Sequence, residues 1–435
     1  MTKRRDIRVL LVAESANPAW VSVPLEGWSL SRAISDLTDS HLATQIRNKP
    51  FIEETGWREG HQFSAIDSES VARPVGLASD WLRRKLKLGW TVTTASEALS
   101  YYAFERELCR KFKKDIAAHR FDIVHRITPL SPTIQSASLI KVCQAAGVPF
   151  VWGPINGGIA WPKEFLDVMR KEGEWLSYLR ELHKLMPGYR LSRAGAAALI
   201  AGSVSSWNQL KAYETKTVYI PENGIDLARF PPVAREQPNA LLRVAFVGRL
   251  VPYKGADMLM IAAEPFIKSG RVALDIIGDG PERATLTALR DSMGLKDNVR
   301  IDGWVEHTKL RERLQFAHVF GFPSVREFGG GVVLEAMAMG LVPIVVGYGG
   351  PNELVTETTG FRIPIANRET VIAGVRKAIK ALLDQPDTLR AMSSNARTRV
   401  LKHFTWERKA EQILECYDWV LRRGERPSYG MPFHD

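Results

Sequence analysis

Three consecutive glycines between two glutamates are the most informative feature of this sequence. Glu327 lies just before the run Gly329–Gly331, and Glu335 lies just after it. Where such a run opens a helix, free backbone N–H groups and the positive end of the helix dipole attract a small anion, and glycine allows its close approach. The flanking carboxylates can accept hydrogen bonds from hydroxyl groups. The stretch therefore predicts a site for an anion that carries hydroxyls; the alternative is a glycine-rich turn with two surface glutamates.

Two cations share the loop that follows the apolar run Val244–Val247. The run ends at Gly248, Arg249 comes next, and Lys254 follows on the same loop. The carboxyl ends of strands are where α/β folds bind ligands. Because an arginine can hold two phosphate oxygens and a lysine acts as a point charge, the pair suits a diphosphate. Either residue alone would more often be a solvated surface charge.

Two other strand-end loops give weaker signals. The segment Gly278-Asp-Gly-Pro281 is a tight turn ahead of a helix, but it lacks the third glycine of a dinucleotide fingerprint, so a nicotinamide cofactor fits poorly. The segment Ile301-Asp-Gly-Trp-Val305 could offer backbone groups to a base, or it is an ordinary loop between a strand and a helix.

Short apolar runs that alternate with helical patterns must position these loops. The expected strands are Arg8–Ala13, Phe121–Val124 and Val148–Trp152 in the first half, and Leu242–Val247, Val272–Ile277, Val299–Ile301, Val319–Pro323 and Val342–Val346 in the second. Helical patterns include 95–118 and 132–146. This alternation predicts parallel sheets covered on both faces, and two such sets predict two doubly wound α/β domains.

The pattern breaks once, in a turn-rich segment that contains Pro231, Pro232 and Pro238. We expect a linker near 228–240, a first domain over 1–228 and a second over 241–405. From Trp406 to Leu421 apolar residues recur at helical spacing, which predicts a final amphipathic helix. This helix and the tail, 406–435, are assigned to the first domain.

Length and composition exclude several classes of protein. The chain has 435 residues, enough for two or three domains. Its hydrophobic share of 45% and charged share of 25% are ordinary for globular proteins, which excludes bulk disorder and collagen. The chain has three cysteines, Cys109, Cys143 and Cys416, which are too few and too scattered for a metal cluster or a disulfide framework. Such sparse cysteine use fits a protein of a reducing compartment. We expect neither a signal peptide nor a membrane span.

The net charge of +11 is concentrated in residues 1–218. The segment Trp81–Trp90 combines four cations with two tryptophans, and Arg110–Lys114 adds a second basic cluster. Basic amphipathic segments with tryptophan suit an anionic membrane surface. The alternative is a helix that packs its Leu and Trp face on the core.

The second half, over roughly 240–420, resembles the retaining glycosyltransferases of family 4, which have the GT-B fold. The resemblance rests on Gly248-Arg249 with Lys254-Gly255, Gly278-Asp-Gly-Pro281, the E-x7-E spacing from Glu327 to Glu335, Gly347-Tyr-Gly-Gly-Pro-Asn-Glu353, and Thr405-Trp-Glu407. It implies two Rossmann-like domains that face each other across a cleft, with the last helix crossing back to the first domain.

The resemblance also implies a nucleotide-diphosphate-sugar donor, with UDP or GDP as its nucleotide, bound by the second domain without a metal or another cofactor. By position, Arg249 and Lys254 would bind the diphosphate, and Glu327 the transferred sugar. The implied donor-binding residues are Gly248, Gly278, Trp304, Val305, Phe328, Gly329, Gly330, Gly331 and Glu335. Among these, Glu335 would hold the ribose hydroxyls and the loop at 304–305 would meet the base.

The first half matches this family less closely. Gly27 stands where the family has a glycine pair, and the strand Phe150–Trp152 leads to Asn156 and Gly157 instead of the usual histidine. Asn156 could hydrogen-bond an acceptor hydroxyl. His125 and Arg126, at the end of another strand, are a second candidate pair. A lone histidine in such a place is more often structural.

We therefore expect a hexosyltransferase acting at the cytoplasmic face of the membrane, with a glycan or lipid-linked acceptor. A nucleotide-sugar epimerase or hydrolase of the same fold is the alternative. A nucleic-acid binder is disfavoured because the sequence has no nucleic-acid-binding module.

Overall fold

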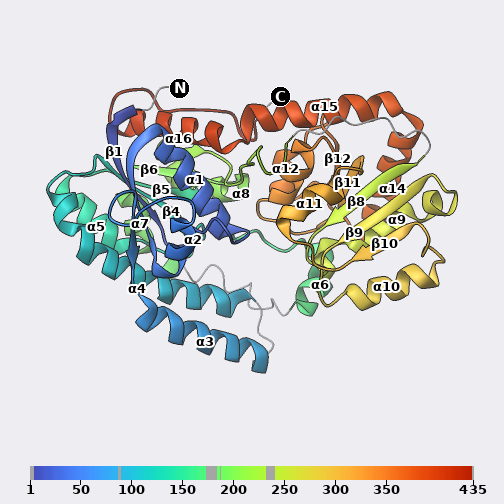
Figure 1. The fold of residues 1–435 in the computed structure, drawn as a ribbon, viewed down its shortest axis with the longest axis horizontal. Coiled ribbons are helices and arrows are strands. Elements are labelled where there is room, and N and C mark those ends of the chain that lie inside the picture. Colours follow the sequence, from blue (N-terminus) through green and yellow to red (C-terminus); the bar gives the residue numbers. More distant parts are fainter. Residues whose placement is uncertain (1–3, 87–89, 173–183, 187, 232–240, 434–435) are drawn as a thin grey trace. The chain divides into compact units, whose positions relative to one another are not determined.

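The computed structural model describes residues 4–86, 90–172, 184–186, 188–231 and 241–433. The chain divides into two compact units (Figure 1). The N-terminal unit contains Met1–Gly158, Gly173–Gly224 and Trp406–Met431, and the C-terminal unit contains Ile159–Glu172, Ile225–Thr405 and Pro432–Asp435. The chain thus leaves the first unit at Gly224, ahead of the proline-rich segment where we expected a linker; residues 232–240 of that segment lie outside the described residues.

The N-terminal unit is built on a parallel sheet of seven strands in the order β3-β2-β1-β4-β5-β6-β7. Its strands are β1 (Arg4–Ala13), β2 (Thr38–Gln45), β3 (Phe63–Ile66), β4 (Ile123–Thr128), β5 (Phe150–Ile155), β6 (Ala198–Ala201) and β7 (Thr217–Tyr219). Its longer helices are α1 (Val23–Leu37), α3 (Glu69–Leu86), α4 (Trp90–Ala117), α5 (Ala137–Ala146) and α16 (Trp406–Val420). The shorter ones are α2 (Lys49–Glu53), α7 (Tyr189–Gly195) and α8 (Val204–Gln209).

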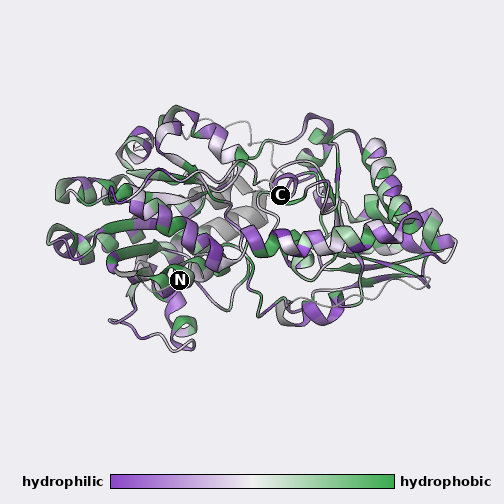
Figure 2. Ribbon diagram, turned by 90° about the horizontal axis from the view of Figure 1, so that it is seen from above, coloured by the Kyte–Doolittle hydropathy of each residue, from purple (hydrophilic) through white to green (hydrophobic). Residues whose placement is uncertain are grey.

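Alternating side chains of β1 supply two separate cores, one on each face of this sheet. Val9 and Leu11 pack in the cluster that holds α1 and α16, whereas Leu10 and Val12 pack in the cluster that holds α4 and α5. Successive strand residues point to opposite faces, so a strand buried on both sides is a continuous apolar run. Figure 2 shows this as hydrophobic colour along the strands and mixed colour along the covering helices.

The C-terminal unit repeats this plan with six parallel strands in the order β10-β9-β8-β11-β12-β13. These are β8 (Leu242–Val247), β9 (Val272–Ile277), β10 (Val299–Asp302), β11 (Val319–Phe322), β12 (Val342–Val346) and β13 (Phe361–Ile363). The helices are α6 (Leu166–Lys171), α9 (Ala256–Lys268), α10 (Arg283–Ser292), α11 (His307–Leu314), α12 (Gly331–Ala338), α13 (Gly350–Leu354), α14 (Arg368–Asp384) and α15 (Pro386–His403).

The predicted fold class is confirmed, with differences in the first half. Helix α5 begins at Ala137 and not at Pro132, because the segment before it binds buried arginines: Gln135 Oε1 accepts a hydrogen bond from Arg193 (2.9 Å), and Ile134 O accepts one from Arg126 (2.8 Å). Strands β2, β3, β6 and β7 were not predicted. β2 was missed because its sequence, TDSHLATQ, is too polar to read as a buried strand.

Each sheet reverses its strand order at one point. The reversal lies between β1 and β4 in the N-terminal unit and between β8 and β11 in the C-terminal unit. Loops at the carboxyl ends of the two strands separate there, which is where open α/β sheets bind ligands. The glycine-rich stretch and the two-cation loop of the sequence follow β11 and β8, and so both lie at the second of these points.

Candidate functional site

The loops after β8 and β11 are joined by an ion pair between Lys254 and Glu327. Lys254 ends a short 3₁₀ turn, Pro252–Lys254, and its Nζ contacts Glu327 Oε2. A backbone hydrogen bond from Val325 N to Tyr253 O (2.9 Å) runs beside the pair. The structure thus brings together two residues that the sequence assigned to separate motifs.

This pair has little contact with solvent. The Lys254 and Glu327 side chains are 14% and 18% exposed. Lys254 Nζ also lies 5.0 Å from the ring centroid of Phe322 and 5.5 Å from that of Tyr253, within reach of a cation–π interaction. Burial raises the pKa of the Tyr253 hydroxyl, an effect that the Lys254 charge opposes. Charges in such surroundings interact more strongly than they would in bulk water. The pair can therefore orient a charged ligand and release it.

The glycine-rich loop after Glu327 meets a second glycine pair, Gly349 and Gly350, which must lack side chains to come this close. Gly350 N donates to Glu327 O (3.1 Å). A Cβ at Gly349 would lie 2.1 Å from Glu327 O, and a Cβ at Gly350 would lie 2.4 Å from the carbonyl oxygens of Phe328 and Gly329. The start of α13 therefore holds the loop from Glu327 to Gly330 in close backbone contact. Gly330 itself has φ 78°, in the left-handed region, and caps α12.

Gly248 and Gly278 also meet through their backbones. Gly278 has φ 148°, and a Cβ there would lie 1.9 Å from Gly248 O. Leu250 N donates to Asp279 O (2.9 Å), which joins the same two loops. Close packing alone accounts for Gly278, whereas Arg249 is exposed on the loop between these contacts.

The remaining donor-side candidates differ in exposure. Trp304, on the loop between β10 and α11, is 72% exposed, which is unusual for a tryptophan. Val305 beside it and Glu335, one turn into α12, are partly buried. The indole of Trp304 thus offers a free face at the edge of the sheet.

Sequence reasoning missed Arg326, which is only 5% exposed. Its guanidinium lies 4.8 Å from the ring centroid of Trp161 and 5.1 Å from that of Phe328, and its Nε donates to Ile159 O (3.3 Å). Arg326 therefore fixes Phe328 and the backbone beside Glu327. The only available signal was an arginine directly before the glutamate.

Two of the acceptor-side candidates lie inside the core of the N-terminal unit. His125 is fully buried, with Tyr417 Oη at 2.6 Å from Nδ1 and Gly153 O at 2.7 Å from Nε2; burial lowers its pKa to about 4, so the ring is neutral. Arg126 is also fully buried and donates to Ile134 O (2.8 Å) and Pro129 O (3.0 Å). These bonds give both residues a structural role, and their placement does not favour contact with an acceptor.

The other acceptor-side candidates stand at the carboxyl edge of the same sheet. Asn156 Oδ1 accepts hydrogen bonds from Gly157 N (2.7 Å) and Ser203 Oγ (2.8 Å), while its Nδ2 has no partner within the described part of the chain. Gly27 lets α1 approach the loop after β1, because a Cβ there would lie 2.2 Å from Ser15 O. Asn156 thus has a fixed amide whose buried Nδ2 makes no hydrogen bond within the described part of the chain.

The basic segments are only partly described. In 81–90, Trp81 is 59% exposed, and the side chains of 82–90 lie outside the described residues. In Arg110–Lys114, the lysines are exposed, Phe112 is buried, and Arg110 Nη1 is paired with Glu107 Oε1 (2.6 Å). Among the helices that the structure describes, none has the length and apolar character needed to cross a bilayer.

Known proteins that resemble this chain are glycosyltransferases and related synthases. Residues 232–399 match the family Glycosyl transferases group 1. Among curated proteins, the chain is 31% identical over 212 residues to a glycogen synthase of Mycobacterium tuberculosis, a match that covers 48% of this chain and 50% of that protein. It is 29% identical over 256 residues to a GDP-mannose-dependent alpha-mannosyltransferase of the same species, a match that covers 57% of this chain and 61% of that protein. The chain spans about half the length of the curated relatives it matches.

Solved structures extend the similarity to both units. Anabaena HepE in complex with UDP matches with a TM-score of 0.61 and 16% identity, over 94% of this chain and 98% of that one. The sucrose-phosphate synthase of Thermosynechococcus elongatus matches with a TM-score of 0.59 and 18% identity, over 96% and 99%. At this identity the likeness establishes the fold, which is the expected GT-B type with two doubly wound units.

Proposed function

We propose that this chain is a retaining glycosyltransferase that moves a hexose-type sugar from a nucleotide-diphosphate-sugar to a hydroxyl acceptor. The proposal rests on the Lys254–Glu327 ion pair at the point where strand order reverses in the C-terminal unit. Arg249 lies on the same loop as Lys254, and a glycine-rich helix start follows Glu327. Cations, a carboxylate and open backbone amides suit a diphosphate with an attached sugar.

In this proposal the charged residues act on the departing nucleotide. The bond between the anomeric carbon and the diphosphate oxygen breaks, and Arg249 and Lys254 stabilise the negative charge that develops on that oxygen. Glu327 holds hydroxyls of the transferred sugar, while the amides of Gly329, Gly330 and Gly331 hold the phosphate or the sugar. The acceptor oxygen attacks from the face that the nucleotide leaves, and the departing phosphate takes the acceptor proton. None of these steps requires a metal.

The rest of the nucleotide is assigned to flanking residues. Glu335 would accept hydrogen bonds from the ribose hydroxyls, and Trp304 with Val305 would meet the base. Gly248 and Gly278 keep the two loops close enough to form the site. UDP or GDP is the expected carrier, since HepE was solved with UDP and the mannosyltransferase relative is named for GDP-mannose.

Thermal unfolding with a panel of nucleotides tests the proposal. We expect UDP or GDP, alone or as a sugar nucleotide, to stabilise the chain, whereas ADP should do so less. A ligand at a hundred times its Kd adds about 2.7 kcal/mol to the free energy of unfolding. A folded chain that responds to no nucleotide would contradict the proposed donor site. Sugar release without an acceptor, or conversion to an epimeric sugar nucleotide, would favour a hydrolase or an epimerase.

For the acceptor we propose a glycan or a lipid-linked glycan intermediate at the cytoplasmic face of the membrane. The exposed Trp81 beside a basic segment and the exposed lysines near 110–114 support contact with an anionic surface. A relative from Arabidopsis thaliana, 26% identical over 211 residues, is named a phosphatidylinositol N-acetylglucosaminyltransferase subunit. Co-sedimentation with anionic vesicles, but not with zwitterionic ones, is the expected result, and equal sedimentation with both would contradict it.

A further inference from the structure

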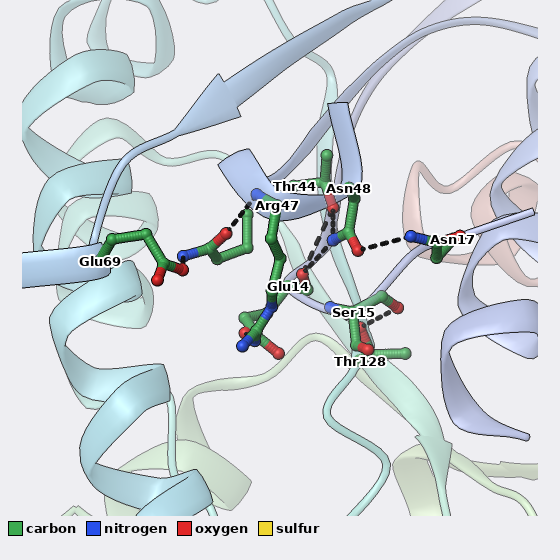
Figure 3. Close-up of polar contacts among 9 residues, drawn as sticks. Glu14, Ser15, Asn17, Thr44, Arg47, Asn48, Glu69 and Thr128 are labelled. Atoms are coloured by element: carbon green, nitrogen blue, oxygen red, sulfur yellow. Dashed lines mark hydrogen bonds and ion pairs between the residues drawn. The ribbon is translucent and has the colours of Figure 1, made fainter. Parts of the chain in front are cut away.

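The N-terminal unit has its own strand-order reversal, between β1 and β4, and polar side chains surround it. Ser15 N donates to Thr128 Oγ1 (3.0 Å), and Thr128 Oγ1 donates to Ser15 O (3.0 Å), which closes the gap between the two strand ends (Figure 3). A reversal of this kind is the expected ligand site of an open α/β sheet. In the C-terminal unit the corresponding place holds Lys254 and Glu327.

On the β2 side of this point, buried amides hold the backbone after β1. Asn48 Nδ2 donates to Glu14 O (2.9 Å) and to Thr44 Oγ1 (2.9 Å), and Asn17 Nδ2 donates to Asn48 Oδ1 (3.3 Å). Asn17, Thr44 and Asn48 have no solvent exposure. These hydrogen bonds stabilise the fold. They also fix the backbone at Glu14, and with it the starting point of the Glu14 side chain.

The same network fixes Arg47. Gln45 Oε1 accepts a hydrogen bond from Arg47 N (2.7 Å), and Gln45 Nε2 donates to Glu69 Oε1. From there the Arg47 side chain runs to Glu14, and its Nη2 is ion-paired with Glu14 Oε1 (Figure 3). Both partners of this ion pair thus start from a rigid backbone, as a preorganised binding group requires.

Each partner of the ion pair keeps hydrogen-bonding capacity that the protein does not use. Glu14 is 8% exposed, and within the described part of the chain its Oε2 receives no hydrogen bond. Arg47 has a side chain that is 40% exposed and has further N–H groups beyond the one that Glu14 receives. The site therefore presents one acceptor and at least one donor side by side.

We propose that Glu14 and Arg47 bind two neighbouring hydroxyl groups of a neutral sugar or polyol, which is the acceptor of the reaction. One hydroxyl donates to Glu14 Oε2 and the other accepts from the Arg47 guanidinium. The inference rests on the proposed function for its role as acceptor site. It replaces His125 and Arg126, whose hydrogen bonds are already made within the core.

The surrounding charge argues for a neutral ligand. Glu69 contacts Gln45 next to the pair, and its charge adds to the burial that raises the pKa of Glu14, while Arg47 lowers it. Desolvation and the charge of Glu14 raise the pKa of Glu97, on α4, to about 7. Among these described residues, the carboxyl groups of Glu14, Glu69 and Glu97 outnumber the guanidinium of Arg47, so a phosphate or carboxylate in this place would be repelled at a pH that ionises them.

Saturation-transfer NMR on the full chain with UDP present tests this binding directly. The probes are methyl α-D-glucopyranoside, methyl α-D-mannopyranoside and myo-inositol, with glucose 6-phosphate as the anionic comparison. We expect at least one neutral probe to bind and glucose 6-phosphate to bind less well. Glu14→Gln should lower the affinity for the neutral probe by about tenfold or more, since a hydrogen bond to a charged group is lost. Arg47→Lys, which keeps a positive charge beside Glu14, should also lower it.

Asp122→Asn is the matched control, because Asp122 is paired with Arg8 of β1 (2.7 Å) on the same unit but lies directly before β4, at the amino end of the sheet. It should leave the neutral probe unaffected. Wild-type affinity in Glu14→Gln, tighter binding of glucose 6-phosphate, or no transfer to any neutral probe would overturn the assignment. Nucleotide stabilisation is measured on the same samples. If UDP and GDP fail while Glu14-dependent sugar binding persists, the proposed function fails and this site stands.

Discussion

Lys254 Nζ and Glu327 Oε2 form an ion pair across 73 positions of the sequence, and they come from the two loops that flank the reversal of strand order. Both side chains are less than a fifth exposed. In a surface pair, the loss of one partner has little effect. In this pair it leaves a desolvated charge beside the proposed diphosphate, so each partner acts through the other.

We expect Glu327→Gln to lower kcat by about a hundredfold to a thousandfold, as the loss of a group that stabilises the transition state does in other enzymes. Lys254→Met should have a similar effect, and the double variant should lose far less than the two effects combined, because the residues act as one unit. Steady-state kinetics with the donor identified by thermal shift measures this. Glu264→Gln, which breaks the exposed pair with Lys268 on α9, should keep normal activity. Wild-type turnover in Glu327→Gln would contradict the assignment.

Arg249→Ala should weaken binding of the bare nucleoside diphosphate by about tenfold to a hundredfold, since it removes charge-assisted hydrogen bonds to phosphate. Isothermal calorimetry with UDP or GDP gives the Kd directly. Arg243→Ala is the control, because Arg243 is an exposed arginine near the other end of the same strand, β8. Equal affinities for Arg249→Ala and Arg243→Ala would place the diphosphate elsewhere.

Gly278→Ala should destabilise the chain by about 3 kcal/mol, because the new Cβ would lie 1.9 Å from Gly248 O at a backbone angle that alanine rarely adopts. Gly294→Ala is the matched comparison. Gly294 also has a positive φ, 69°, but its Cβ would meet nothing within 4 Å, so only about 1 kcal/mol of backbone strain is expected. Urea unfolding of both variants separates the contact from the strain. Similar losses in the two variants would mean that the loops can move apart.

The sequence predicted which residues lie at the carboxyl end of the C-terminal sheet, because the signals for these positions are local. A buried strand followed by Gly248 and Arg249, or by Glu327 and three glycines, places these groups at a strand end without knowledge of the whole fold. Local signals could not predict the pairing of Lys254 with Glu327. It follows from β8 lying next to β11 in the sheet, and that neighbour relation comes from packing between distant segments.

The N-terminal half was harder for the same reason. His125 follows an apolar run just as a ligand-binding histidine would, and only its contact with Tyr417, 292 positions away, shows that it belongs to the core. Glu14 and Arg47 were overlooked because the polar strand β2 was not predicted, and its position beside β1 brings the two residues together. Polar strands covered on both faces give no hydrophobic run to detect.

The buried Lys409 makes the stability of the chain depend on pH. It is 1% exposed on α16, and its Nζ donates to Pro221 O within the N-terminal unit. Burial lowers its pKa to about 7, against the attraction of the nearby Glu222 and Glu26 carboxylates. In the unfolded chain a lysine titrates near 10.4.

Between pH 7 and about 10 the unfolded chain therefore binds more protons at Lys409 than the folded chain does. Its contribution makes the free energy of unfolding rise with pH in this window, by at most about 1.4 kcal/mol per pH unit. We expect Lys409→Met to lack this rise, whereas Lys402→Met, at an exposed position of α15, should keep it. Chemical denaturation at several pH values gives the slopes. Equal slopes in the wild type and Lys409→Met would mean that Lys409 stays protonated in the fold, held by Glu222 and Glu26 more strongly than burial opposes it.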